Sequence, residues 1–310
     1  MTTLLWSGVF VLSLAALVWA SSVLIGAAER IGLALGMSPF IVGVVIVGIG
    51  TSFPELVSSV YAAMTGATEI VIGNVLGSNI TNILLVLGLA GVIAKECDVD
   101  HDVLHIDLPI VLASALMLGF MIYDGTFGRV DALIACAGCA IYVFSTLETS
   151  AADKDSPSSG ERVATGTWLR LIGALAVIVV SAKYTVDAVV ALSVAFDIGV
   201  EIIALSAVAL GTSLPEIAIS LTAARQGKPE LAVGNIMGSN VFNAFAVMGI
   251  PGLITPLTIP REVIIFPLPV SIAVTLLYII ITVDGKINRW EGWLLLLFYA
   301  YFIAHLYGLA

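Results

Sequence analysis

Charged side chains are scarce in this sequence. Asp, Glu, Lys and Arg together make up 11% of the 310 residues, whereas hydrophobic residues make up 60%. An average soluble domain carries about a quarter charged residues. The composition therefore excludes an ordinary soluble protein and predicts a chain that crosses a lipid bilayer several times.

Cysteine and histidine are also rare, with three residues of each. Three cysteines do not make a disulfide framework, and the CxxC of Cys136 and Cys139 lies in an apolar segment, where packing is favoured over redox chemistry. The histidines lack the spacing of metal ligands. We therefore expect no thiolate or imidazole metal site, no bound cofactor and no nucleic-acid partner.

Apolar segments long enough for membrane helices, which need about 20 residues, occur along the whole chain. The ten segments span residues 4–27, 39–64, 70–94, 106–123, 130–147, 168–192, 200–224, 230–254, 263–283 and 290–308. The first segment has no basic n-region and is longer than a signal peptide's apolar core, so we expect it to be retained. The predicted fold is an all-α polytopic membrane protein with ten transmembrane helices.

The distribution of Lys and Arg predicts the orientation of the chain, because cytoplasmic loops carry an excess of both. With the N-terminus outside, the inner loops and their edges hold nine of these residues, and the outer loops hold only Arg129 and Arg261. We therefore expect a protein of the plasma or inner membrane with both termini outside. The polar, Ser-rich linker 149–167 would then lie in the cytoplasm.

The chain contains two copies of one sequence pattern. GTSFPE at residues 50–55 recurs as GTSLPE at residues 211–216, and residues 50–88 and 211–249 are identical at 18 of 39 positions without a gap. Similarity of this kind indicates an internal duplication. Five spans in each copy mean that the second copy enters the membrane from the opposite side.

The duplication predicts two inverted five-helix repeats, residues 1–148 and 168–310, on either side of the linker. Inverted repeats with interrupted helices at matching positions are typical of secondary transporters, whose binding site lies near the middle of the membrane.

A proline and a carboxylate stand together in the middle of each repeated span, as Pro54 with Glu55 and Pro215 with Glu216. Proline has no N–H and displaces the carbonyl four residues earlier, so we expect both prolines to break their helices and free nearby carbonyl oxygens. A charged residue at a span centre costs at least about 2.5–3.5 kcal/mol on insertion scales and is usually functional. Neither motif contains a basic residue, which points to a bound cation.

Amide and hydroxyl oxygens follow each carboxylate in the next span. One helical face carries Asn74, Ser78 and Asn82 in the first copy, and Asn235, Ser239 and Asn243 in the second. A purely structural role in hydrogen bonding between helices stays open for Asn74, Asn79, Asn235 and Asn240. Hard oxygen donors suit Ca²⁺ or Na⁺ better than Mg²⁺, which demands strict octahedral geometry.

The paired motifs G-T-S-[FL]-P-E and G-N-x-x-G-S-N resemble the α-repeats of the cation/Ca²⁺ exchanger superfamily, in particular its prokaryotic sodium/calcium exchanger branch. The resemblance covers the whole ten-span plan. It implies long, tilted first and sixth helices that slide for alternating access, exchange of Ca²⁺ for Na⁺, and a monomer that is sufficient for transport.

The resemblance also implies a set of ion ligands. Glu55 and Glu216 would bind both ions, and the carbonyl oxygens of Thr51 and Thr212 would complete the Ca²⁺ site. The implied Na⁺ ligands are Ser52, Ser213, Ser78, Ser239 and the carbonyl oxygens of Gly48 and Ala209. Asn82 matches a polar ligand at the centre of the site.

One implied ligand departs from the family pattern. Position 243 is often Asp in the family, but here it is Asn243. The site then has two acids instead of three, so one Ca²⁺ or two Na⁺ would neutralise it. Stoichiometry and K⁺ co-transport therefore do not follow from the resemblance.

Three other functions need weighing. A Ca²⁺/H⁺ antiporter of the same superfamily is the main alternative, although the predicted core holds only two residues that could carry protons. A passive cation channel would conduct without a counter-ion, and the inverted repeats favour a transporter over it. An intramembrane enzyme would need a nucleophile motif beside the carboxylates, and the sequence has none, so we expect no enzymatic activity.

Overall fold

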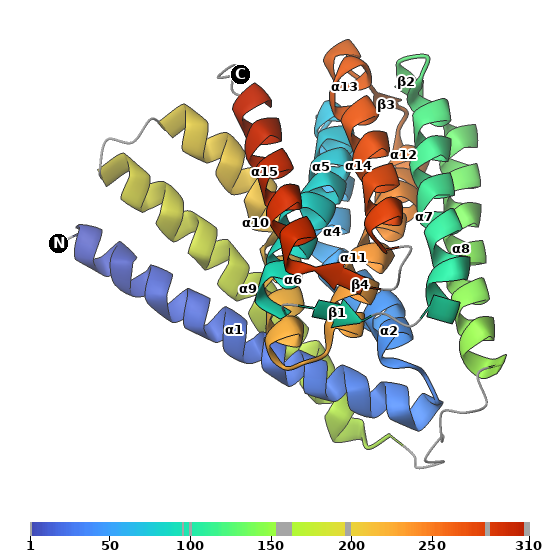
Figure 1. Ribbon diagram of the computed structural model, residues 1–310. Helices are drawn as coiled ribbons and strands as arrows, with labels where there is room; N and C mark the ends of the chain where they lie inside the picture. The colour runs from blue at the N-terminus through green and yellow to red at the C-terminus, as the bar shows by residue number, and fades with distance from the viewer. Residues whose placement is uncertain are drawn as a thin grey trace.

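The computed structural model describes residues 2–94, 96–98, 101–152, 163–195, 200–282 and 286–306 (Figure 1). For some of them, including 193–195 and 200–212, only the backbone is described. The first half contains α1 (Thr2–Leu35), α2 (Pro39–Ile41), η1 (Val42–Gly48), α3 (Ile49–Thr51), α4 (Phe53–Met64), α5 (Glu69–Thr81), η2 (Asn82–Leu87), α6 (Gly88–Ala94), α7 (His101–Ile122) and α8 (Arg129–Ala152). The second half contains α9 (Thr165–Ala195), α10 (Val200–Arg225), α11 (Pro229–Phe242), η3 (Asn243–Val247), α12 (Met248–Ile254), α13 (Arg261–Ile265), α14 (Pro267–Thr282) and α15 (Arg289–Leu306). The η elements are π-helical.

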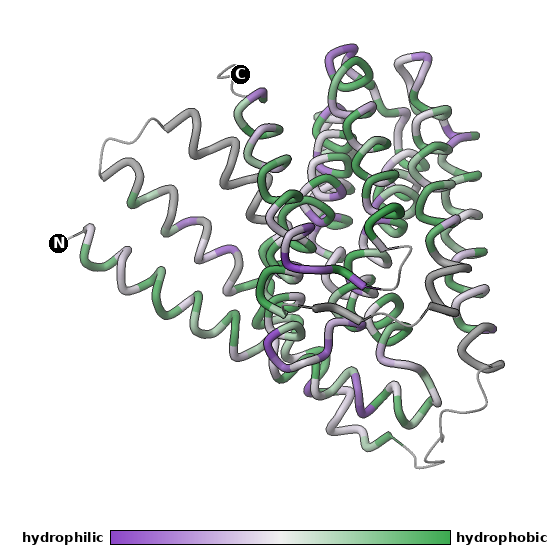
Figure 2. The backbone as a smooth tube through the Cα atoms, in the orientation of Figure 1, coloured by the Kyte–Doolittle hydropathy of each residue, from purple (hydrophilic) through white to green (hydrophobic). Residues whose placement is uncertain are grey.

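All ten predicted segments are helical in the structure. Among the described residues, seven helical stretches are long and apolar enough to cross a membrane, and Leu108–Ile122 is a shorter apolar helix. Figure 2 shows hydrophobic residues along most of the helices and hydrophilic residues concentrated at the turns that join them. The mostly helical, multi-span architecture is confirmed, and the count of ten spans stays a prediction.

The helices form a central group and an outer group. The stretches Glu69–Ala94 and Pro229–Ile254 are mostly buried inside the protein, whereas Arg129–Glu148 presents most of its surface outward. Because the outer helices expose many large hydrophobic side chains, such as Phe120 and Phe144, lipid is their natural surrounding. These two central stretches carry the repeated motifs GNVLGSN and GNIMGSN.

The helices α1 and α9 pack along each other on one side of the molecule (Figure 1). Their contact forms an apolar cluster, separate from the main core, around Leu24, Ile25 and Ile178. With 34 residues, α1 is about 50 Å long, more than the hydrocarbon thickness of about 30 Å. Both helices accordingly run obliquely to α7, α8 and α14 in Figure 1.

Two short antiparallel strand pairs join the two halves of the chain. Strand β1 (Glu96–Asp98) pairs with β4 (Lys286–Asn288), and β2 (Thr126–Phe127) pairs with β3 (Leu257–Thr258). A shift of 161 residues, the offset of the repeated motifs, carries β1 onto β3 and β2 onto β4. The two pairs are therefore equivalent contacts, and Figure 1 places them at different heights in the molecule.

The two spans differ in how they accommodate the predicted helix-breaking prolines. The first span is interrupted at one residue, Ser52, with φ −81° and ψ 3°, and Pro54 lies in the first turn of α4, where proline is tolerated. The second helix, α10, runs without interruption through Pro215. The prediction of a break at Pro215 is wrong, because membrane helices accommodate proline when neighbouring groups satisfy the freed backbone. Both prolines still remove one helical N–H.

Glycine brings α2 and η1 into backbone contact with α11. A Cβ built on Gly234 would lie 2.3 Å from the Phe40 carbonyl oxygen, and one on Gly238 would lie 2.3 Å from that of Val44. The expected close approach at this GxxxG pair is therefore present. A Cβ on Gly73 or Gly77, at the equivalent positions of the first half, would meet no described atom within 4 Å.

The CxxC segment lies in α8 and packs against α12. Cys136 and Cys139 are free thiols, and a Cβ on Gly249 would lie 2.8 Å from the Cys136 sulfur. This close packing agrees with the interpretation of these cysteines as small hydrophobic residues.

Candidate cation-binding site

Buried polar side chains gather where α4 and α10 meet the central stretches. All of the following are at most 2% exposed: Thr51, Ser52, Glu55, Ser78, Asn82, Ser213, Glu216, Asn235, Ser239 and Asn243. Burial of polar groups is costly unless they find partners. Most of the residues predicted as ion ligands are thus brought together in one place.

The two carboxylates lie at the centre of this cluster. Glu55 sits in the first turn of α4 and is 0% exposed, and Glu216 follows Pro215 in α10 and is 1% exposed. The hydroxyls of Thr51 and Ser52 lie close to the Glu216 carboxylate. The GTSFPE motif of the first half is therefore near the carboxylate of the second half.

Oxygen atoms from both halves surround Thr51. Its hydroxyl lies 3.1 Å from Asn235 Oδ1, 3.2 Å from the Gly48 carbonyl oxygen and 3.3 Å from the Ser239 hydroxyl. The Gly48 carbonyl also accepts from the Ser239 hydroxyl at 3.2 Å and from the Ser52 N–H at 3.2 Å. The close contact of η1 with α11 holds this group together.

One side-chain contact is repeated in the two halves. Asn74 Nδ2 donates to the Ser59 hydroxyl at 3.1 Å, and Asn235 Nδ2 donates to the Ser220 hydroxyl at 2.9 Å. Asn74 and Asn235 thus hold each carboxylate-bearing helix against the helix that follows it. This result supports the structural alternative that the sequence left open for these two asparagines.

Four asparagine side chains link the halves reciprocally. Asn79 Nδ2 donates to the Asn240 carbonyl oxygen at 3.1 Å, and Asn240 Nδ2 donates to the Asn79 carbonyl oxygen at 3.4 Å. Asn82 Nδ2 donates to Asn240 Oδ1 at 3.0 Å, and Asn243 Nδ2 donates to Asn79 Oδ1 at 3.1 Å. Each bond has its counterpart after the shift of 161 residues.

The cluster leaves several buried oxygens without a hydrogen bond. They are Asn82 Oδ1, Asn243 Oδ1, the Ser52 hydroxyl and both carboxylate oxygens of Glu216. Buried acceptors in proteins are almost always satisfied, so a group of exceptions calls for a partner. A cation can satisfy a group of acceptors that has no donor beside it. Carboxylate, amide and hydroxyl oxygens are the ligands that hard cations prefer.

The π-helical segments were not predicted from the sequence. η2 begins at Asn82 and η3 begins at Asn243, the same position of each repeat. Single π-turns inside α-helices occur frequently at functional sites. Nothing in the residue types at these positions distinguishes a π-turn from an α-helical turn.

Of the remaining predicted ligands, some join the cluster and others lie outside the described surroundings. Ser213 lies 3.5 Å from Ser78, hydroxyl to hydroxyl, so these two also join the halves. Thr212 and Ala209 lie outside the residues whose surroundings the structure describes. Within the described part of the chain, no group of three or more His, Cys, Asp or Glu side chains could hold a metal ion, so any cation here relies on two carboxylates and neutral oxygens.

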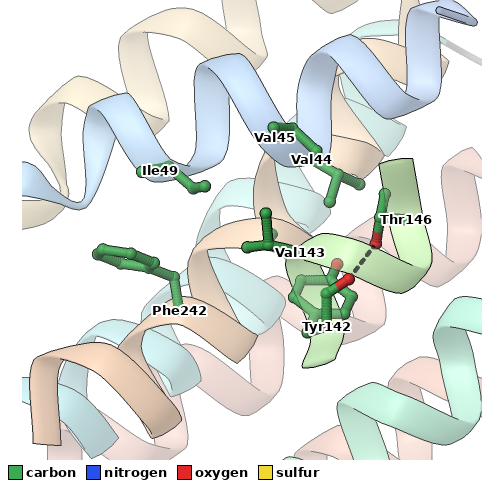
Figure 3. Close-up of a pocket in the computed structure, with 8 residues that line it drawn as sticks. Val44, Val45, Ile49, Tyr142, Val143, Thr146 and Phe242 are labelled. Atoms are coloured by element: carbon green, nitrogen blue, oxygen red, sulfur yellow. Dashed lines mark hydrogen bonds between the residues drawn. The ribbon is translucent and has the colours of Figure 1, made fainter. Parts of the chain in front are cut away.

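A small cavity beside the cluster is not the site. It lies between η1, α8 and α11, and Val44, Tyr142 and Phe242 contribute to its lining (Figure 3). Its volume is about 10 Å³, the lower limit for one water molecule. No carboxylate lines it, and the Thr146 hydroxyl beside it donates to the Tyr142 carbonyl at 2.9 Å.

Comparisons with known proteins match the whole chain. The solved structure of the sodium-calcium exchanger NCX_Mj, soaked with 2.5 mM Na⁺ and 10 mM Sr²⁺, is similar with a TM-score of 0.86 at 30% identity, over 97% of this chain and 99% of that one. Sodium/calcium exchanger MaX1 of Methanosarcina acetivorans is 33% identical over an alignment of 342 positions, gaps included, which covers 96% of this chain and 97% of that protein. Inner membrane protein YrbG of Escherichia coli is 31% identical over an alignment of 266 positions, gaps included, which covers 82% of this chain and 81% of that protein.

A family model gives the last comparison. The model described as sodium/calcium exchanger protein matches twice, over residues 5–147 and residues 166–308. Both halves of the chain therefore match the same family, in agreement with the repeated motifs. The chain belongs to the sodium/calcium exchanger family, within the cation/Ca²⁺ exchanger superfamily.

Proposed function

We propose that this protein is a secondary active transporter that exchanges Ca²⁺ for Na⁺ across the plasma or inner membrane by alternating access. The observation that carries the proposal is the set of buried oxygens between the two halves that make no hydrogen bond, among them Asn82 Oδ1, Asn243 Oδ1 and the Glu216 carboxylate. Such a set suits a desolvated cation. The relatives named above are exchangers or membrane proteins, and none is named as an enzyme.

Ca²⁺ and Na⁺ would compete for overlapping ligands in this site. Glu55 and Glu216 would bind both ions, with the Thr51 and Thr212 carbonyls completing the Ca²⁺ site. Asn82 and Asn243 would contribute amide oxygens at the centre. The remaining Na⁺ ligands would be Ser52, Ser78, Ser213, Ser239 and the carbonyls of Gly48 and Ala209. Because both ions cannot occupy the same oxygens together, binding of one would exclude the other.

The proposed architecture has ten spans in two inverted repeats, residues 1–148 and 168–310. The double match of the family model, the equivalent strand pairs and the reciprocal asparagine contacts support it. We place both termini outside and the linker 149–167 in the cytoplasm. The distribution of Lys and Arg supports this orientation. In Figure 1 the end of α15 and the end of α8 lie at opposite ends of the molecule.

Removal of either carboxylate tests the role of the site. In vesicles loaded with Na⁺, Glu55→Gln and Glu216→Gln should abolish ⁴⁵Ca²⁺ uptake, because the neutral amide lacks the charge that a desolvated divalent ion needs. Glu262→Gln is the matched control, since Glu262 is exposed in α13 and should retain uptake. Wild-type rates in both site variants would contradict the proposal.

The alternatives differ in what drives Ca²⁺ movement. A Ca²⁺/H⁺ antiporter would take up Ca²⁺ in response to a pH gradient and ignore Na⁺. A channel would show conductance in single-channel recording without an exchange ion, whereas alternating access predicts saturable flux that depends on the counter-ion. The presence of only two carboxylates among the ligands proposed here favours Na⁺ over H⁺.

A further inference from the structure

We propose that Asn79 and Asn240 are positioning residues, which turn the amides of Asn243 and Asn82 so that both present their carbonyl oxygens to the transported cation. The inference rests on the proposed function, because it assumes that a cation binds at these amides. From the sequence alone, a purely structural role stays open for Asn79 and Asn240.

The orientation of the first two amides follows from the main chain. A main-chain carbonyl oxygen can only accept a hydrogen bond. Asn79 lies 3.1 Å from the Asn240 carbonyl oxygen and must direct its NH₂ group there, and Asn240 does the same toward the Asn79 carbonyl oxygen at 3.4 Å. The side-chain Oδ1 of each residue therefore lies on the opposite arm of its amide.

The amides of Asn79 and Asn240 also fix the orientation of the proposed ligands Asn243 and Asn82. Asn79 Oδ1 accepts from Asn243 Nδ2 at 3.1 Å, and Asn240 Oδ1 accepts from Asn82 Nδ2 at 3.0 Å. With their NH₂ groups engaged, Asn243 and Asn82 turn their own Oδ1 atoms away from Asn79 and Asn240. Both of these Oδ1 atoms are buried and make no hydrogen bond.

A flipped amide would ruin a cation ligand, because it would present two N–H donors in place of the oxygen. The two main-chain carbonyls fix the orientation of the Asn79 and Asn240 amides. These amides in turn orient Asn82 and Asn243 so that both present an oxygen to the site. The arrangement is reciprocal, so each half of the chain orients the ligand of the other half.

The same geometry predicts how a carboxylate at position 243 would behave. Asn243→Asp would place an oxygen against Asn79 Oδ1, which is an acceptor facing an acceptor. Asn79 cannot escape by turning over, since its Oδ1 would then face the Asn240 carbonyl oxygen. An ionised carboxylate at position 243 would therefore face Asn79 Oδ1 without a proton between the two oxygens, and Asn79→Ala should relieve this repulsion.

A double-mutant cycle on the full-length protein tests this coupling. We would measure Ca²⁺ affinity by calorimetry in detergent, and Na⁺-driven ⁴⁵Ca²⁺ uptake in proteoliposomes, for wild type, Asn79→Ala, Asn243→Asp and the double variant. Asn79→Ala should weaken Ca²⁺ binding about tenfold, the effect of about 1.4 kcal/mol at one ligand. The double variant should recover at least half of that loss on a logarithmic scale, because a carboxylate presents an oxygen in either orientation.

Asn74→Ala provides the matched control. Asn74 holds two helices together at the same site, but it does so by donating to the Glu55 carbonyl and the Ser59 hydroxyl and not to the other asparagines. A purely structural role for Asn79 predicts that Asn243→Asp fails to rescue either alanine variant, and that result would overturn the inference. If Asn79→Ala does not fold, Asn240→Ala with Asn82→Asp repeats the cycle on the equivalent pair.

The two readouts separate the two claims. Ca²⁺ binding with the predicted rescue but without Na⁺-driven uptake would contradict the proposed exchange and leave the positioning role supported. Wild-type protein that binds no Ca²⁺ in calorimetry would overturn the positioning role as well.

Discussion

The backbone contact between η1 and α11 makes Gly238→Ala an informative perturbation. The added Cβ would lie 2.3 Å from the Val44 carbonyl oxygen and 2.8 Å from the Val44 Cα. Carbon and oxygen normally approach no closer than about 3.3 Å, so the two helices must separate by about 1 Å. That movement would pull the Gly48 carbonyl from the Ser239 hydroxyl, now 3.2 Å apart.

The magnitude follows from two opposing effects. Overpacking costs about 1–3 kcal/mol, and the upper value applies here because main-chain atoms cannot rotate out of the way. Alanine in place of glycine contributes about 1 kcal/mol to helix stability. We therefore expect Gly238→Ala to lower stability by about 2 kcal/mol. Gly77→Ala, at the equivalent position with no described atom within 4 Å of its Cβ, should raise it by about 1 kcal/mol.

Thermal unfolding in detergent, followed by tryptophan fluorescence, measures this difference between the two variants. Gly238→Ala should also reduce Na⁺-driven ⁴⁵Ca²⁺ uptake, because the Thr51 group loses its contacts with α11, while Gly77→Ala should retain uptake. Equal effects of the two substitutions on melting temperature and uptake would refute the reasoning.

Two further predictions concern side-chain contacts. Thr51→Val removes the hydroxyl that contacts Asn235, Ser239 and the Gly48 carbonyl. A buried polar group left without its partner costs about 1–3 kcal/mol, so we expect the Na⁺ concentration for half-maximal uptake to rise about tenfold. Thr146→Val, which loses only a bond to Tyr142, should leave the Na⁺ dependence unchanged, and equal loss in both would contradict a role for Thr51 in the site. The Lys228 and Glu29 side chains lie 2.6 Å apart and remain about one-third and one-quarter exposed, so a double-mutant cycle of melting temperatures should give a coupling below about 1 kcal/mol that weakens at high salt.

Much of the architecture could be predicted from the sequence because the signals are local and repeated. Apolar length located all ten helical segments, and the coincidence of Glu55 and Glu216 in two copies of one motif located the polar centre of the bundle. Both carboxylates are fully buried, as their position in the middle of apolar segments implied.

Other features depend on contacts that a single sequence does not reveal. The π-turns that begin at Asn82 and Asn243 add one residue to a helical turn, and the packing between the halves decides where this happens. The unbroken path of α10 through Pro215 depends in the same way on its neighbours. The reciprocal bonds of Asn79 and Asn240 join residues 161 positions apart, beyond the range of any helical periodicity.

Simultaneous measurement of both ions tests the proposed exchange most directly. Proteoliposomes loaded with ²²Na⁺ and diluted into ⁴⁵Ca²⁺, with the internal and external pH equal, should gain Ca²⁺ and lose Na⁺ in a constant ratio. Both fluxes should disappear in Glu216→Gln. Entry of Ca²⁺ without loss of Na⁺, or entry that requires a pH gradient, would contradict Na⁺/Ca²⁺ exchange.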